Sequence, residues 1–267
     1  MLKKTLKLLK ENPSIIIFYF FYTALIVIIT AIMANNLNIN IDAADTTQIF
    51  NFLKHTLGWW IIIGVIFTIF MSGWGNMIAH AVNTDKAAPG TFFKGINEFI
   101  LRMLITNLLL IIICIGFIIV ITLISIPLFF IMESTVSSSG AVTIGIIYGL
   151  VIALIFILLY PFFMLWYPAI FVDNIGIMEA FQRSVRTSKK CYWTLVLTLF
   201  VSALPEILYI VITEVMNYGK TSNALQLTSP VYWVYIGINI LVFITVSVFT
   251  YVLYKQKNSD KVKSVNS

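Results

Sequence analysis

One acidic residue, Glu206, stands inside a long apolar segment, directly after Pro205. It follows Trp193 by thirteen residues, which places it about 20 Å into a helix that rises about 1.5 Å per residue. An ionisable side chain at that depth is costly in lipid and predicts a functional site, and the proline frees a backbone carbonyl beside it. The pair predicts proton-coupled or cation-binding chemistry. The alternative is a Glu that only joins helices by hydrogen bonding, or one that reaches the outer headgroups.

Three amide side chains also lie in apolar segments, those of Asn76, Asn107 and Asn239. They can line a polar path, although an intramembrane Asn more often bonds a neighbouring helix for about 1 kcal/mol. We place Asn107 and Asn239 with Glu206 and Pro205 in one candidate binding set.

Small residues recur at four-residue spacing in Gly145, Gly149 and Ala153. This pattern lets two helix backbones approach closely, either within the chain or between copies, and predicts a helix-packing face. Gly73 and Gly75 suggest the same role in an earlier segment.

No residue pattern predicts a catalytic or metal centre. His55 and His80 are expected at opposite membrane boundaries, and neither Cys114 nor Cys191 belongs to a metal-ligand motif. The sequence contains no GxSxG, HExxH or P-loop motif. We therefore expect no enzyme activity, no metal and no cofactor.

Composition defines the elements that must position these residues. The chain is 60% hydrophobic and only 10% charged, whereas a soluble domain has about 25% charged residues. Segments of about 20 apolar residues cross a bilayer as helices. Six such segments predict one all-α integral membrane domain over residues 1–254, with spans at Ile15–Met33, Trp59–Ala79, Met103–Phe130, Val142–Phe171, Trp193–Ile212 and Val231–Tyr254.

The basic residues predict the orientation of these spans. Of the 17 Lys and Arg residues, 15 lie in the N-terminal segment, the second and fourth connections and the tail, and only Lys54 and Lys220 lie in the alternate connections. Because cytoplasmic loops carry the excess of positive charge, both termini are expected in the cytoplasm, with the protein in the plasma membrane.

Apolar and basic residues share helical spacing in three stretches that precede odd-numbered spans, near 2–11, 91–102 and 175–190. This pattern predicts three cytoplasmic interfacial amphipathic helices that bind anionic headgroups of the lipid bilayer. The net charge of +6 is explained by this role, and nucleic acid is not expected as a partner. The tail 255–267 is expected to be disordered. Pro161 and Pro168 should bend the fourth span.

Several short stretches resemble a group of bacterial membrane proteins: 7–13 (KLLKENP), 90–96 (GTFFKGI), 167–173 (YPAIFVD), 178–184 (MEAFQRS), Lys189-Lys190 and Trp193. The group contains the membrane domain of some glycerophosphoryl diester phosphodiesterases and stand-alone six-span proteins of unknown function. The resemblance implies a six-span fold. It implies no hydrolase activity, because this chain carries no phosphodiesterase domain.

Two functions remain in view, and a membrane enzyme that acts on lipid is kept only as a remaining third alternative. The missing catalytic motifs and the basic helices favour an accessory, assembly or immunity-type component that works with protein partners or lipid. The set around Glu206 favours a transporter or exporter of a small or amphiphilic solute. The frequent Ile, Lys, Asn, Phe and Tyr suggest an AT-rich, bacterial genome.

Overall fold

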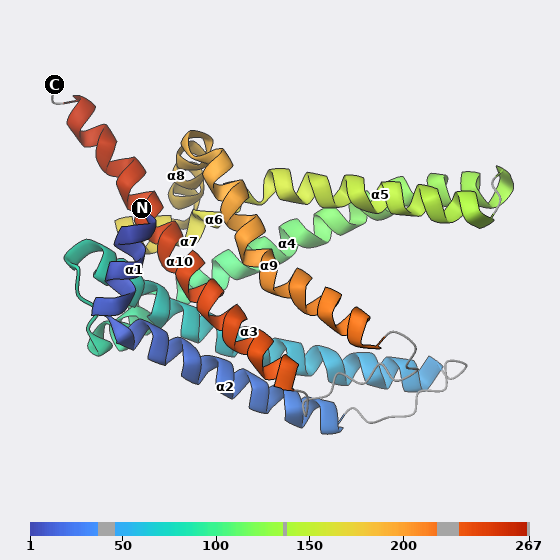
Figure 1. Cartoon of the computed structure of the whole chain (residues 1–267), viewed down its shortest axis with the longest axis horizontal. Coiled ribbons are helices and arrows are strands. Elements are labelled where there is room, and N and C mark those ends of the chain that lie inside the picture. The colour runs from blue at the N-terminus through green and yellow to red at the C-terminus, as the bar shows by residue number, and fades with distance from the viewer. Residues whose placement is uncertain (37–45, 136–137, 218–229, 266–267) are drawn as a thin grey trace.

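The structure is a computed structural model that describes residues 1–36, 46–135, 138–217 and 230–265. Over these residues it is all-helical (Figure 1). The helices are α1 (Leu2–Glu11), α2 (Pro13–Asn36), α3 (Thr46–Thr84), α4 (Pro89–Thr135), α5 (Ser138–Leu159), α6 (Pro161–Met164), α7 (Trp166–Asp173), α8 (Ile177–Lys190), α9 (Tyr192–Asn217) and α10 (Pro230–Val265).

Six helical segments of the described chain are long and apolar enough to cross a membrane. They are Pro13–Met33, Thr56–Thr84, Pro89–Pro127, Ile147–Asp173, Tyr192–Thr213 and Pro230–Asn258. Each overlaps one of the six segments that the sequence predicts, so the all-α fold with six candidate spans is confirmed.

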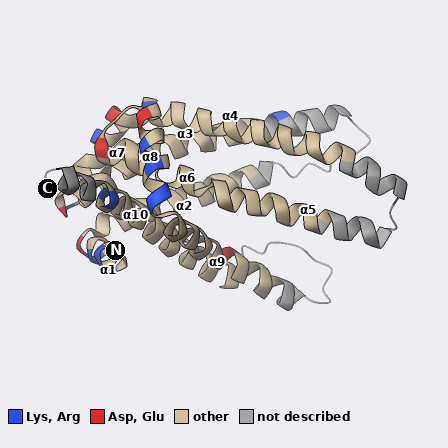
Figure 2. Ribbon diagram, turned by 90° about the horizontal axis from the view of Figure 1, so that it is seen from above, with Lys and Arg blue, Asp and Glu red and all other residues tan. Residues whose placement is uncertain are grey.

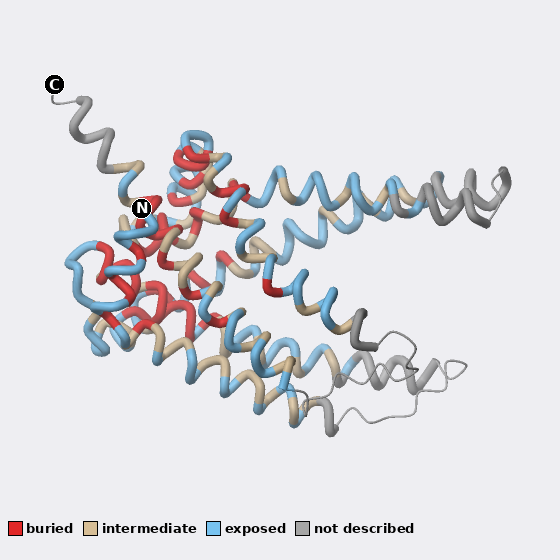
Figure 3. Tube along the Cα trace, viewed as in Figure 1, coloured by how far each residue is buried: buried red, intermediate tan, exposed pale blue. Residues whose placement is uncertain are grey.

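The buried core lies at one end of the bundle (Figure 3). Trp74, Phe99, Met103 and Tyr254 are fully buried there, on α3, α4 and α10. Most of the described Lys, Arg, Asp and Glu residues gather at the same end, around α1, α7 and α8 and both termini (Figure 2). Buried aromatic rings contribute large contact areas, so this charged end is also the tightly packed end of the molecule.

The opposite parts of the spans are packed much more loosely. The second half of α4 and the whole of α5 form a long hairpin that projects from the core (Figure 1). In the most apolar stretch of the third candidate span no residue is buried, and in that of the fourth only 6% are. Where its side chains are described, this hairpin therefore exposes mostly apolar groups, as a lipid-facing element does.

The fourth predicted span is interrupted at its prolines. The run 142–171 is divided into α5, α6 and α7, with Pro161 at the first position of α6. Proline at a first helical position has no amide hydrogen to leave unpaired. The expected bend is thus confirmed, and it turns the chain so that α7 enters the buried core.

Two stretches differ from the sequence prediction. The stretch 91–102 is not a separate helix, because no helix breaker follows it and Gly95 packs it against α3; it is the beginning of α4. The tail was expected to be disordered from residue 255, yet α10 continues to Val265. In that tail, Lys255 and Asn258 make hydrogen bonds to α3 and α8, and residues 266–267 lie outside the described chain.

Hydrogen bonds from Asn12 hold α1 against the turn between α3 and α4. Its Nδ2 donates to the carbonyl oxygens of Leu8 at 2.8 Å and of Asp85 at 3.2 Å, and its Oδ1 accepts from the amide of Ala87. Asp85 has a left-handed backbone, with φ of 62°, which Asp adopts more readily than most residues. Asn12 thereby fixes the position of α1 relative to this turn.

Candidate functional site

Glu206, the acid singled out in the sequence, is hydrogen-bonded across a helix pair. Tyr235 of α10 donates from Oη to Oε2 of Glu206 on α9, and Nδ2 of Asn239 donates to the same Tyr235 hydroxyl at 3.0 Å. Glu206 is exposed at the surface of the helix bundle, and Pro205 beside it is buried. Two predicted residues, Glu206 and Asn239, are therefore brought together by Tyr235.

Further aromatic rings pack around Tyr235, the hydrogen-bond donor to this carboxyl group. Tyr209 stacks on Tyr235 with a centroid distance of 4.3 Å, and Tyr232 lies edge-on to Tyr209 at 6.3 Å. The faces of tyrosine rings attract cations. A carboxyl group with a phenol donor and adjacent ring faces can exchange a proton or hold a small cation. We call Glu206, Tyr209, Tyr232, Tyr235 and Asn239 the tyrosine–glutamate cluster.

Asn107 lies apart from this cluster and joins other helices. Its Nδ2 donates to Oγ1 of Thr68 on α3 at 2.8 Å, and its Oδ1 accepts from Oη of Tyr167 on α7 at 2.6 Å. Both functions of the amide are used within the protein, which is the usual arrangement for an intramembrane Asn. In this structure Asn107 connects three helices.

A second polar centre lies at the packed end, around Asp173. Its Oδ2 accepts hydrogen bonds from Arg183 of α8 at 2.8 Å and from the hydroxyl of Tyr254 of α10 at 2.6 Å. The neighbouring Asn174, in the left-handed conformation that ends α7, accepts from Arg102 of α4 at 2.6 Å. The end of α7 is thereby connected to α4, α8 and α10.

Arg183 is held by two carboxylates. Besides Asp173 it bonds Glu179, one helical turn earlier, at 2.7 Å. The hydrogen bond that Arg183 donates to Asp173 is the main reason that the pKa of the Arg183 guanidinium is raised above its ordinary value. The charge that orders this corner is therefore permanent at physiological pH.

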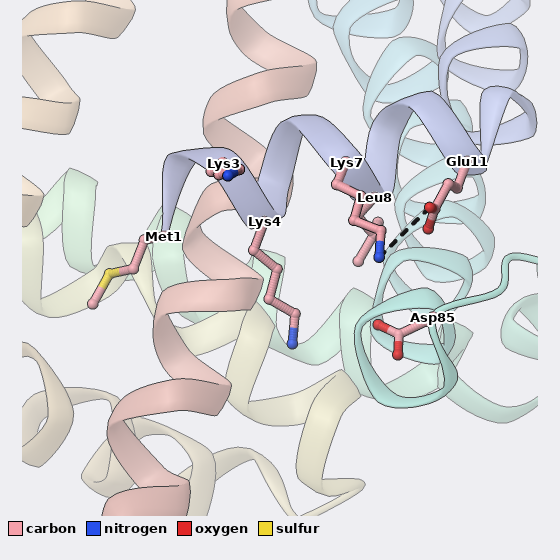
Figure 4. Close-up of a pocket in the computed structure, with 7 residues that line it drawn as sticks. All are labelled: Met1, Lys3, Lys4, Lys7, Leu8, Glu11 and Asp85. Carbon is pink, nitrogen blue, oxygen red and sulfur yellow. Dashed lines mark ion pairs between the residues drawn. The ribbon is translucent and has the colours of Figure 1, made fainter.

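A cavity of about 540 Å³ opens between α1 and the turn at Asp85 (Figure 4). Lysine and acidic side chains share its walls. The lining residues are Met1, Lys3, Lys4, Lys7, Leu8, Glu11 and Asp85. We call it the α1 pocket.

The predicted helix-packing face on α5 makes no close contact within the described chain. Gly145, Gly149 and Ala153 are exposed, and a Cβ built on either glycine would meet nothing within 4 Å. This face of α5 therefore does not pack against another helix of the described chain. Packing between copies of the protein stays a prediction.

Close approach of helices occurs elsewhere. A Cβ on Gly75 would lie 2.5 Å from the ring of Phe171, and one on Gly95 would lie 2.7 Å from the carbonyl oxygen of Ser72. Gly95 is a contact that the sequence analysis does not identify.

Tyrosines are the functional residues that the sequence analysis misses. Tyr235, Tyr167 and Tyr254 each complete a polar centre, yet none is distinguished from an aromatic at a span end. A tyrosine inside an apolar segment could have indicated these sites in the sequence, because a buried hydroxyl group needs a hydrogen-bond partner. Over the described residues, no group of three or more His, Cys, Asp or Glu side chains is placed to hold a metal ion.

The fold and its polar centres define the class: an all-α, multi-pass membrane protein with six candidate spans. Within that class, the chain belongs to the family described as Domain of unknown function (DUF7847), whose profile matches residues 1–256. No curated protein and no solved structure matches the chain.

Proposed function

We propose that this chain is a non-enzymatic accessory or assembly component of a bacterial plasma membrane that acts with a protein partner. One observation carries the proposal, namely the contrast between the two ends of the molecule. The Asp173 corner joins α4, α7, α8 and α10 into a rigid base. The α4–α5 hairpin, in contrast, buries almost none of its described residues, although its two helices contact each other through Phe117 and Phe156.

This arrangement supports assembly better than enclosed transport. Transporters place their substrate site between helices near the middle of the membrane. Here α5 presents its small residues to the surroundings rather than to a neighbouring helix of the same chain. A hairpin of this kind is suited to contact another membrane protein side by side, because small residues allow close helix approach in lipid.

The proposed orientation places the packed, charged end in the cytoplasm together with both termini. The distribution of lysine and arginine supports it. In this orientation α1, α8 and the beginning of α4 lie at the cytoplasmic surface as amphipathic elements. Exposed Leu2 and Leu6 on α1 suit contact with lipid, and exposed Lys189 and Lys190 on α8 suit contact with anionic headgroups.

The relation to the membrane domain of some glycerophosphoryl diester phosphodiesterases belongs to the same proposal. It is supported by the common six-span layout and the short stretches at 7–13, 90–96, 167–173 and 178–184. It concerns the fold only, and no hydrolase chemistry follows from it.

The experiment is purification from native membranes in mild detergent, followed by identification of stoichiometric partners. We expect a defined membrane protein to co-purify with the wild type. A double substitution on the hairpin, Gly145→Leu with Gly149→Leu, should reduce its recovery. Gly64→Leu is the matched control, because that glycine is also exposed with open space around it, on α3. A wild-type protein that carries only lipid would contradict the proposal.

A second candidate function is transport or export of a small or amphiphilic solute. The tyrosine–glutamate cluster favours it, because an ionisable group between two spans is the usual mark of an ion-coupled path. Glu206→Gln removes the charge and keeps an oxygen that accepts from Tyr235. Transport would then be abolished in a protein that still folds, and unchanged solute flux in this variant would remove the reason for proposing it.

A further inference from the structure

The α1 pocket contains more positive charge than its own acids neutralise. Lys3, Lys4 and Lys7 line it, with Glu11 and Asp85 as the acidic residues. Figure 4 shows Lys4 and Lys7 extending from α1 on the side where Asp85 lies. The excess of cations over acids makes the pocket a place for an anion.

The ion pairs within the pocket are incomplete. Lys7 lies 3.7 Å from Glu11, one helical turn away, in a pair that is largely exposed. Among the described residues, neither Lys3 nor Lys4 forms an ion pair. Asp85 lies across the pocket, and its carbonyl group, not its carboxylate, holds Asn12. Lys3 and Lys4 are thus available to a ligand, and the carboxylate of Asp85 is the one acidic group among the described residues of the pocket that opposes an anion there.

A further positive charge stands behind the pocket. Lys255 of α10 lies within electrostatic range of both Lys4 and Asp85. Its Nζ is fixed by a hydrogen bond to the carbonyl oxygen of Val82 at 2.9 Å, so its position is set by α3 and α10. This ammonium group raises the local potential for an anion and is held in place before any ligand arrives.

We propose that the α1 pocket binds a phosphate monoester group. Such a group carries about two negative charges near neutral pH, which suits Lys3 and Lys4 together with nearby Lys255, while Asp85 opposes part of the attraction. Lysine binds phosphate as a point charge with three donors and does not require planar geometry. A pocket of about 540 Å³ has room for the phosphate and for part of the molecule that bears it.

The flank of α1 that carries the lysines differs from the one that carries its exposed leucines. At 3.6 residues per turn, Leu2 and Leu6 project on nearly the opposite side of the helix from Lys4 and Glu11. Leu2 and Leu6 are 57% and 52% exposed.

The phosphate has two possible sources, a soluble phosphate compound or the headgroup of phosphatidic acid, and the test distinguishes them.

The inference rests on the proposed function only for the cytoplasmic position of α1. Purified full-length protein is placed in nanodiscs of phosphatidylcholine and titrated with inorganic phosphate, with binding followed by the phosphorus NMR line width of the added phosphate. In parallel, nanodiscs with added phosphatidic acid are analysed by native mass spectrometry for retained lipid. Saturable binding in the first experiment identifies a soluble ligand, and retention in the second identifies a headgroup.

Three variants make the assignment specific. Lys4→Gln should weaken phosphate binding, or phosphatidic acid retention, about tenfold, as expected for loss of one charge-assisted hydrogen bond. Lys10→Gln is the matched control, because Lys10 lies on the same helix, is exposed and does not line the pocket. Asp85→Asn should strengthen binding, because it removes a negative charge and Asn tolerates the left-handed backbone.

Equal effects of Lys4→Gln and Lys10→Gln would overturn the proposal, as would weaker binding in Asp85→Asn or no binding of either ligand by the wild type. Partner recovery from native membranes is measured on the same variants. If recovery is unchanged in Lys4→Gln while phosphate binding fails to appear, the pocket assignment falls and the assembly function stands. If phosphate binds and no partner is found, the pocket assignment stands and the assembly function falls.

Discussion

Tyr254 of α10 donates a hydrogen bond of 2.6 Å to Asp173 at the end of α7, although 81 positions separate them in the chain. Arg183 of α8 donates to the same carboxylate oxygen. One acid therefore fixes the relative positions of two helices that meet the core from different directions.

Removal of that acid should loosen the packed end of the molecule. We expect Asp173→Ala to lower the free energy of unfolding by about 2 kcal/mol, because two donors lose their acceptor. Glu179→Ala is the control: this residue pairs with the same arginine but is 54% exposed at its side chain, and it should cost about 0.5 kcal/mol. Thermal unfolding in mild detergent measures both, and equal losses would contradict the assigned role of Asp173.

The hydroxyl of Tyr235 should stabilise the contact between α9 and α10. Tyr235→Phe removes the donor to Glu206 and the acceptor for Asn239, at an expected cost of about 1 kcal/mol. Tyr232→Phe removes a hydroxyl from the same cluster that makes no hydrogen bond with the described residues. The two variants are compared by thermal unfolding, and a Tyr232→Phe variant as unstable as Tyr235→Phe would refute this explanation.

Glycines on two different helices should respond in opposite ways to the same substitution. Gly95→Ala places a Cβ 2.7 Å from a backbone oxygen that cannot easily move, and overpacking of this kind costs about 1–3 kcal/mol. Gly149→Ala meets open space and should stabilise the helix by about 0.5–1 kcal/mol. The unfolding temperature should fall in Gly95→Ala and rise in Gly149→Ala. An unchanged unfolding temperature in Gly95→Ala would show that α3 and α4 are not in close contact.

The thiol of Cys191 should be unreactive in the folded protein. It is buried and donates to the carbonyl oxygen of Thr187 at 3.3 Å. Burial is the main cause that raises its pKa, more than nearby lysines lower it. The neutral thiol is therefore favoured in the folded state, and this contribution to stability is present at neutral pH and lost as pH rises through the raised pKa. Maleimide labelling of a Cys114→Ala variant should be slow at neutral pH, faster in alkali and rapid after denaturation.

Cysteine labelling also tests the proposed orientation. In a background without the two native cysteines, Lys189→Cys on α8 and Lys54→Cys on α3 introduce exposed thiols at opposite ends of the spans. A membrane-impermeant maleimide should label Lys54→Cys in intact cells and Lys189→Cys only in inverted vesicles. The reverse pattern would place both termini outside the cytoplasm.

Much of the fold follows from composition alone. Six apolar segments of sufficient length have few alternatives to spanning helices, because backbone groups in lipid must bond within their own segment. The division of the fourth span at Pro161 follows from the missing amide hydrogen of proline. These features depend on local sequence, so they can be predicted without knowledge of the neighbouring helices.

The pairings between helices depend on contacts that the sequence does not specify. Glu206 is recognisable as an unusual acid, but its partner Tyr235 lies 29 positions away on another span. The stretch 91–102 has the spacing of an interfacial helix, but no helix breaker follows it and Gly95 packs it against α3, so it is the beginning of α4. The exposure of Gly145 and Gly149 is likewise a result of where α5 projects.

The continuity of α10 has a mechanical consequence. As one helix from Pro230 to Val265, it extends for about 54 Å at 1.5 Å per residue. Tyr235 and Tyr254 therefore lie on one continuous helix. Tyr235 is hydrogen-bonded to Glu206, and Tyr254 is hydrogen-bonded to Asp173. If α10 tilts so that Tyr235 moves away from α9, Tyr254 is displaced relative to α7, because both tyrosines belong to the same helix. A movement at one end of the bundle therefore reaches the other end through α10 alone.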